Sequence, residues 1–190
     1  MTELSLSAIN ATAPYHLRIS ELGGFDFDID AGLTYNIALI EDYTFGEGFE
    51  TFMLNVLPHS MEEYNRIKRD RSVKMRRDDK IRQTVMAVLE EALRHQNIII
   101  DYVCMSEDER QDFRARLFSR WFRDYADDSK YRLLTTSLKV GNVTNYLGAF
   151  LRRDNELYDA FCAAFDQFDK DIHKDEPWDV HISETSSLVL

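Results

Sequence analysis

Hydrophobic and polar residues alternate along the first third of the chain. Phenylalanine or isoleucine alternates strictly with aspartate in FDFDID at 25–30, which predicts a half-buried strand with an acidic outer face. Gly32 follows with turn chemistry, and the alternation resumes in TYNIALI, so these two runs predict a hairpin. With two further runs they predict a meander of about four strands, at residues 15–20, 25–30, 34–40 and 49–57.

The spacing of apolar residues changes from residue 61 onward. Residues 61–80 form a charged, helix-compatible linker, and apolar residues from Ile81 to Leu93 then recur every three or four positions. This spacing predicts an amphipathic helix. The next run, NIIIDYVC at 97–104, is short and almost entirely apolar, so we expect a central strand that is covered on both faces.

The segment from Ser106 to Tyr125 predicts a helix with arginines inside its apolar stripe. Ser106 and Glu109 match a capping box, which places the start of the helix here. At about 100° per residue, the stripe contains Phe113, Leu117, Trp121 and Tyr125, with Arg110 and Arg114 among them. Arg116 and Arg120 fall toward the flank of the stripe, where we expect them to be solvated.

Arg110 and Arg114 therefore need a source of negative charge, because an unpaired buried guanidinium is strongly unfavourable. One interpretation is structural pairing with an acid such as Asp101 or Asp108, or with neighbouring main chain. The alternative is a phosphate or carboxylate of a ligand, bound close to the helix N-terminus. We favour structural pairing and keep Arg110 and Arg114 as candidate anion-binding residues.

The last third of the chain completes an α+β pattern. Residues 131–140 and 143–153 flank a Gly-Asn turn and predict a second hairpin. A final helix, which begins at Asp154 or Asn155 and runs to Ile172, places its aromatic residues on one face. Helices do not alternate strictly with strands, so we expect a mainly antiparallel sheet of six or seven strands, with about three long helices on one side.

The composition fits one folded domain. The chain has 190 residues, of which 44% are hydrophobic, with only 7 Gly and 3 Pro, so it can bury a self-sufficient core. We expect a flexible N-terminus at 1–14, a single domain at 15–172 and a polar tail at 173–190. Two widely separated cysteines, no signal peptide and no run of about 18 apolar residues lead us to expect a cytoplasmic protein without a membrane span.

Positive charge is concentrated in one segment of an acidic chain. The net charge of −11 argues against a surface adapted as a whole to nucleic acid or lipid. The basic segment contains Arg66, Lys68, Arg69, Arg71, Lys74, Arg76, Arg77, Lys80 and Arg82. Such a segment can contact phosphates, but it lacks aromatic residues for base stacking. We favour a solvated segment or one that meets an acidic partner.

No motif predicts catalysis or a cofactor. Cys104 precedes a helix N-terminus, where a thiolate would be stabilised, but no histidine and orienting acid accompany it recognisably. We therefore expect a buried structural thiol. The run HKDEPWDVH at 173–181 contains metal-ligand residue types in a spacing that fits no site template, so no metal is expected.

The central part of the chain resembles a family of uncharacterised bacterial proteins, known mainly from Bacteroidota. In that family a Tyr-x-Cys strand leads to an Asp-x-Arg-Gln turn and an Arg-x-Arg-Leu-Phe-x-x-Trp-Phe helix. The matching residues are Tyr102, Cys104, Asp108, Arg110, Gln111, Arg114, Arg116, Leu117, Phe118, Trp121 and Phe122. The chain departs from the pattern at Met105 and Glu109. The resemblance spans residues 15–172 and implies a fold and a cytoplasmic compartment, but no activity.

These observations favour a non-enzymatic protein-interaction or accessory module, with a protein partner or a second copy of the chain as the expected partner. The first alternative is nucleic-acid or anion binding through the basic segment together with Arg110 and Arg114. The second alternative is a cysteine-dependent enzyme that uses Cys104.

Overall fold

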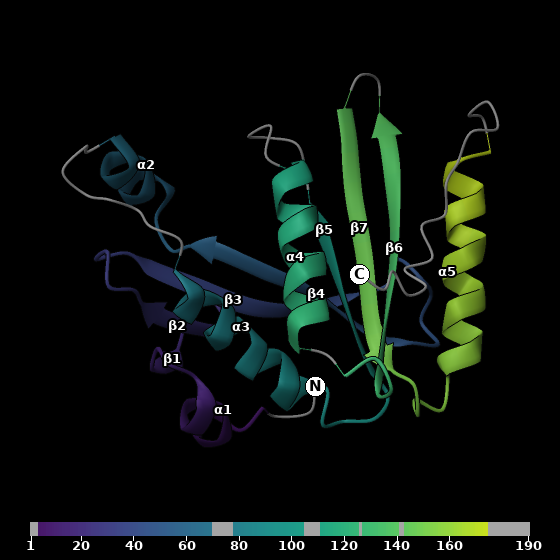
Figure 1. Cartoon of the computed structure of the whole chain (residues 1–190), viewed down its shortest axis with the longest axis horizontal. Helices are drawn as coiled ribbons and strands as arrows, with labels where there is room; N and C mark the ends of the chain where they lie inside the picture. The colour runs from purple at the N-terminus through teal and green to yellow at the C-terminus, as the bar shows by residue number, and fades with distance from the viewer. Residues whose placement is uncertain (1–3, 70–77, 105–110, 126, 141–142, 175–190) are drawn as a thin grey trace, which may run out of the picture.

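A single sheet of seven strands organises the molecule. The computed structural model describes residues 4–69, 78–104, 111–125, 127–140 and 143–174, and these also form five helices (Figure 1). The strands are β1 (Leu17–Ile19), β2 (Phe25–Asp28), β3 (Thr34–Asp42), β4 (Glu50–Pro58), β5 (Ile98–Cys104), β6 (Tyr131–Val140) and β7 (Val143–Arg152). The helices are α1 (Leu6–Thr12), α2 (Met61–Arg69), α3 (Asp79–Ala92), α4 (Gln111–Tyr125) and α5 (Tyr158–Ile172).

The strand order is β1-β2-β3-β4-β5-β7-β6, and the predicted α+β class with a mainly antiparallel sheet is confirmed. Neighbouring strands are antiparallel with one exception, since β4 and β5 run parallel. A parallel pair requires a crossover connection, and α2 and α3 lie in the segment that joins these two strands. The segment expected to be a charged linker therefore contains a helix of its own, α2.

The helices cover both faces of the sheet, which corrects the expectation that they pack on one side. α3 and α4 pack on one face, which is the front in Figure 1, whereas α5 supplies Phe161 and Phe165 to a separate core on the other face. The cause lies in β5, where Ile99 belongs to the α5 core and Ile100 to the front core. Successive side chains of a strand point to opposite faces, so this apolar strand needs cover on both.

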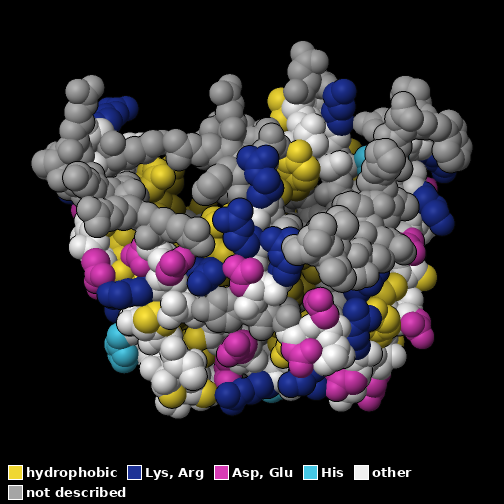
Figure 2. Space-filling view, viewed as in Figure 1, with side chains coloured by type: hydrophobic (Ala, Val, Ile, Leu, Met, Phe, Trp, Pro, Cys, Tyr) yellow, Lys and Arg dark blue, Asp and Glu magenta, His cyan; other side chains and the backbone are white. Residues whose placement is uncertain are grey.

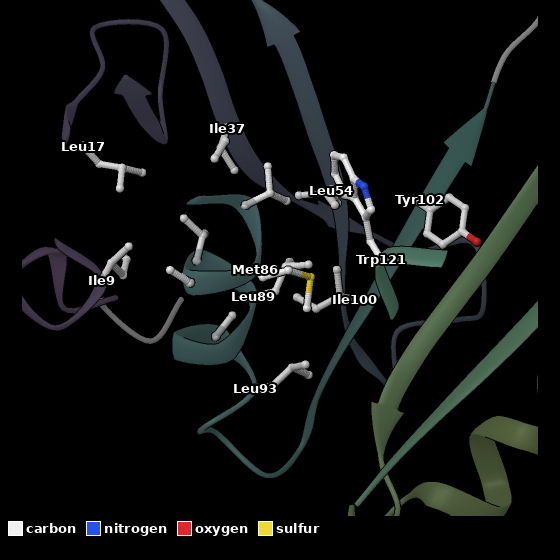
Figure 3. Close-up of a cluster of buried hydrophobic side chains, with 14 of the residues drawn as sticks. Ile9, Leu17, Ile37, Leu54, Met86, Leu89, Leu93, Ile100, Tyr102 and Trp121 are labelled. Carbon is white, nitrogen blue, oxygen red and sulfur yellow. The ribbon is translucent and has the colours of Figure 1, made fainter. Parts of the chain in front are cut away.

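The front core is the larger of the two and lies between the sheet, α3 and α4. Figure 3 shows part of it, with Ile9, Leu17, Ile37, Leu54, Met86, Leu89, Leu93, Ile100, Tyr102 and Trp121 labelled. Each large apolar side chain that is fully buried stabilises the fold by about 1.5–3 kcal/mol. On the back, Phe45 packs edge-on against Phe161 and stacks on Phe165, with ring centroids 5.0 and 5.5 Å apart.

The N-terminal segment differs from the flexible arm expected at 1–14. Residues 6–12 form α1, the Ser5 hydroxyl accepts a hydrogen bond from the Ala8 N–H, and the helix packs against α3. Ile9 is only 1% exposed and belongs to the front core. One buried side chain in a seven-residue helix leaves almost no periodic signal, so the sequence pattern did not reveal this element.

Candidate functional site

Helix α4 carries three arginines along one exposed stripe. Arg116, Arg120 and Arg123 are separated by four and three positions, so they lie on one side of the helix, and all three side chains are exposed. On the side that packs against the sheet, Trp121 and Phe122 are buried. This packing fixes the rotation of α4 and therefore the direction of the arginine stripe.

The stripe borders a cavity of about 350 Å³ between α4 and the strands behind it. We call this cavity the arginine pocket. Its lining consists of Tyr102, Ala115, Arg116, Ser119, Arg120, Arg123, Thr135, Thr136, Tyr146 and Leu147. Figure 2 shows basic side chains gathered over α4 in the middle of this face. The pocket therefore combines three positive charges with several hydroxyl groups.

Tyr102 forms part of the pocket wall and is held rigidly. Its ring stacks on Phe118 of α4, with centroids 4.8 Å apart, and the side chain is 2% exposed. Gly148 lies opposite Tyr102 on β7, and a Cβ at this glycine would collide with the tyrosine ring. The absence of a side chain at Gly148 thus makes room for Tyr102.

The Tyr102 hydroxyl remains a hydrogen-bond donor at neutral pH. Burial raises the pKa of Tyr102 to about 12, although a hydrogen bond with Ser119 opposes the shift. A protonated phenol can donate one hydrogen bond, and the hydroxyl of Ser119 lies beside it in the same lining. Because Tyr102 and Ser119 are hydrogen-bonded to each other, one of their two hydroxyl hydrogens remains to be donated to an anion.

The pocket arginines differ from Arg82 of α3 in how their charges are neutralised. Arg82 of α3 forms an ion pair with Asp124 at 3.3 Å, and its side chain is 16% exposed. Within the part of the chain that the structure describes, Arg116, Arg120 and Arg123 form no ion pair or hydrogen bond. Their donors are thus available to an external acceptor.

The two arginines singled out from the sequence cannot be placed in this pocket. Arg110 lies outside the described residues, and Arg114 lies in α4 but its side chain is not described. Asp101, expected as a structural partner, is on the opposite face of the sheet from α4. Its neighbour on β5, Tyr102, faces α4, whereas Asp101 meets Asp42. The proposed pairing of Arg110 and Arg114 itself lies outside the described residues.

The structure describes only part of the basic segment. Among its described residues, Arg66 and Lys80 form ion pairs with acids of this chain. Arg66 pairs with Glu63 at 3.0 Å on α2, and the ammonium of Lys80 lies 2.7 Å from a carboxylate oxygen of Asp30. Arg69 is exposed at the end of α2. The positions that lie outside the described residues are Arg71, Lys74, Arg76 and Arg77, and the side chain of Lys68 is not described either.

The predicted burial of Cys104 is confirmed, since the residue has no exposed surface. A buried thiol without access to solvent is a poor nucleophile. Among the described residues, no group of three His, Cys, Asp or Glu side chains could hold a metal ion. Residues 175–181 of the HKDEPWDVH run lie outside this description. No described helix is long and apolar enough to cross a membrane.

The arginine pocket was missed in the sequence because each arginine on the flank looked solvated by itself. The available signal was the spacing R-x-x-S-R-x-x-R at 116–123, which places three guanidinium groups and a hydroxyl on one stripe. The helix pattern could not reveal the opposite wall of the arginine pocket. Thr135, Tyr146 and Leu147 come from β6 and β7, at least 12 residues later in the chain.

Residues 77–167 match the sequence model of a family described as a family of unknown function (DUF6169). No curated protein and no solved structure matches the chain. The resemblance to an uncharacterised family is thus confirmed at this level, over a shorter segment than 15–172. The expected bacterial distribution and central motif stay predictions. Every residue that lines the arginine pocket falls inside the matched segment.

Proposed function

We propose that this protein binds a small ligand carrying a phosphate or carboxylate group in the arginine pocket. The observation that carries the proposal is the set of three arginines on α4 that face a hydroxyl-lined cavity without a described acid as partner. This retains the anion-binding alternative from the sequence and transfers it from Arg110 and Arg114 to their neighbours on the same helix.

Guanidinium groups suit this role because their planar donor fork matches the oxygens of carboxylate and phosphate. Like charges at a spacing of four residues destabilise a helix by a few tenths of a kcal/mol. Arg116 and Arg120 therefore repel each other until an anion lies between them. Binding an anion would remove this repulsion and stabilise α4 against the sheet.

The size and composition of the pocket favour a small ligand over a nucleic acid. Ligand pockets have volumes of about 300–1,000 Å³, and the arginine pocket, at about 350 Å³, falls at the lower end of this range. The net charge of −11 would repel a long polyanion, whereas a compact anion meets mainly the local positive charge.

Binding rather than catalysis is proposed because of the side chains in the lining. The described lining residues include no carboxylate, imidazole or thiol, which are the groups that most often act as general bases or nucleophiles. The hydroxyl of Tyr102, whose pKa is raised to about 12 by burial, stays protonated and can donate but cannot accept a proton readily at neutral pH.

The test is a calorimetric titration with pyrophosphate and, separately, with citrate at matched ionic strength. We expect binding to the natural chain and a loss of at least tenfold in affinity for Arg116→Gln/Arg120→Gln/Arg123→Gln, because charge-assisted hydrogen bonds contribute about 1.5–3 kcal/mol each. The matched control is Arg66→Gln/Arg69→Gln/Lys170→Gln, which removes the same three charges from exposed positions on α2 and α5.

The control variant should bind both anions within about threefold of the natural chain, a margin smaller than the contribution of one such hydrogen bond. Equal losses in the two triple variants would show that only overall charge matters, and would overturn the pocket as the binding site. If neither pyrophosphate nor citrate binds to the natural chain, the proposal is also overturned.

A further inference from the structure

Strand β3 has an open edge over its second half. β3 has nine residues, but β2 pairs only with the first four of them, from Thr34 to Ile37. On the other side, β4 pairs with β3 as far as Asp42. Within the described part of the chain, Ala38–Asp42 therefore has a strand neighbour on one side alone.

The open edge borders a cavity of about 1190 Å³. Six consecutive residues of β3, from Asn36 to Glu41, line it. Successive side chains of a strand point to opposite faces, so a cavity lined by a consecutive run lies along the edge of the strand and extends over both faces. We call this cavity the edge groove. It is separate from the arginine pocket, and its β3 wall lies outside the segment 77–167.

The hairpin between β1 and β2 explains why the edge is left open. Gly23 and Gly24 both have positive φ, at 89° and 69°, a region that favours glycine. A Cβ on Gly24 would collide with the backbone of Ile37. The chain therefore turns at the point where Gly24 lies against β3, and β2 begins only at Phe25.

The edge groove has an apolar surface, and the charged residues of its open edge are the two acids Glu41 and Asp42. Ile40 and Leu57 are 45% and 51% exposed, and Leu22 in the hairpin turn is also exposed. Residues 38–42 contain no Lys, Arg or Pro, the residue types that commonly prevent edge pairing. Alternate residues along such an edge direct backbone N–H and C=O groups outward, where an added strand can pair with them.

We propose that an extended segment of a partner protein, with basic residues alternating with apolar ones, docks in the edge groove as an additional strand beside Ala38–Asp42. Main-chain hydrogen bonds along the edge would provide affinity, and contacts to alternate side chains would provide specificity. The partner is basic because Glu41 is exposed in the groove and no Lys or Arg is among the described lining residues. This proposal is independent of anion binding on α4.

The probe is a fluorescein-labelled peptide KVTVKV, measured by fluorescence polarisation with the full chain. Two further peptides carry N-methyl groups on alternate backbone nitrogens. One is methylated at the odd-numbered residues and the other at the even-numbered residues. In an added strand, one set of N–H groups faces β3 and the other faces solvent. We expect one methylated peptide to lose at least tenfold in affinity and the other to bind within threefold of KVTVKV.

The protein variants test the charge preference. Glu41→Lys should weaken binding of KVTVKV at least tenfold, whereas Glu47→Lys, the same change at an exposed position outside the groove, should leave it within threefold. Equal effects of the two variants would overturn the basic partner. The methylated peptides need no protein variant, so the proposal stays testable even if Glu41→Lys folds poorly.

Three other results would overturn the proposal. The first is the absence of binding of KVTVKV, and the second is any other pattern for the two methylated peptides. The third is self-association of the natural chain in sedimentation equilibrium that Glu41→Lys abolishes. That result would identify a second copy of this chain as the occupant of the groove.

Discussion

The carboxyl group of Asp101 is buried on the face of the sheet that α5 covers. Asp101 is 1% exposed, and its Oδ1 atom has no hydrogen-bond partner among the described residues. Burial, with the charge and the hydrogen bond of nearby Asp42, raises the pKa of Asp101 to about 7. Removing a charged carboxylate from water is unfavourable, so the folded protein holds this proton more strongly than the unfolded chain does.

This shift predicts that the stability of the fold falls as the pH rises. The ordinary pKa of the group is 3.8 and the folded value is about 7, so its stabilising contribution is complete below pH 4 and is lost as the pH rises through 7. We expect Asp101→Asn to raise the free energy of unfolding at pH 8 by about 4 kcal/mol, since the pKa of Asp101 rises from 3.8 to about 7 and one pKa unit corresponds to about 1.36 kcal/mol. Urea unfolding between pH 4 and pH 8 measures the change.

The asparagine amide can donate a hydrogen bond to Asp42 in place of the Asp101 proton. For this reason the higher free energy of unfolding of Asp101→Asn should be seen at pH 8 and should disappear near pH 4. Asp166→Asn, at an exposed position of α5, serves as the control and should change the free energy of unfolding by less than about 0.5 kcal/mol. A variant at Asp101 that is less stable than the natural chain at pH 8 would contradict the prediction.

Helix α3 is anchored at its start by Asp78, which connects it to the N-terminal part of the chain. One carboxylate oxygen of Asp78 accepts a hydrogen bond of 2.9 Å from the Lys80 N–H, and the other accepts a bond of 2.6 Å from the Tyr15 hydroxyl. Burial and the hydrogen bond to Asp78 raise the pKa of Tyr15 to about 12. A single side chain therefore caps the helix and holds Tyr15 in place.

Loss of this cap should destabilise the fold and release Tyr15. We expect Asp78→Ala to lower the free energy of unfolding by about 1–2 kcal/mol, the usual contribution of an N-cap, and to lower the pKa of Tyr15. Thermal unfolding and an ultraviolet titration of tyrosine measure the two effects. Asp78→Asn keeps the cap and should restore most of the stability. Equal losses in both variants would mean that the charge of Asp78, and not its capping bond, stabilises α3.

The helices show which part of an element the sequence can reveal. The apolar spacing from Ile81 to Leu93 predicted α3 closely, because its buried positions recur over 14 residues. The same reasoning identified the amphipathic character of α4, but it placed the functional interest on Arg110 and Arg114 within the apolar stripe. The structure draws attention to Arg116, Arg120 and Arg123 instead, because only the strands behind α4 turn that stripe into a pocket.

The molecule as a whole is larger than the domain expected at 15–172, since α1 packs on α3 and completes the front core. We expect Ile9→Ala to lower the free energy of unfolding by about 2–4 kcal/mol, as for other buried isoleucines. Urea unfolding measures the loss, and Ser7→Ala, at an exposed position of α1, should change stability by less than about 0.5 kcal/mol. A change at Ile9 as small as that at Ser7 would contradict the packing of α1.

The sequence by itself determined the order and type of most elements, the mainly antiparallel sheet and the burial of Cys104. Each of these depends on local periodicity, because a strand or helix must present its apolar residues on the side that is buried. Only the tertiary structure decided that α5 covers the face opposite α3 and α4, that Asp101 lies away from α4, and that β3 has an open edge. These features arise where segments distant in sequence meet, and spacing along the chain carries no information about which segments those are.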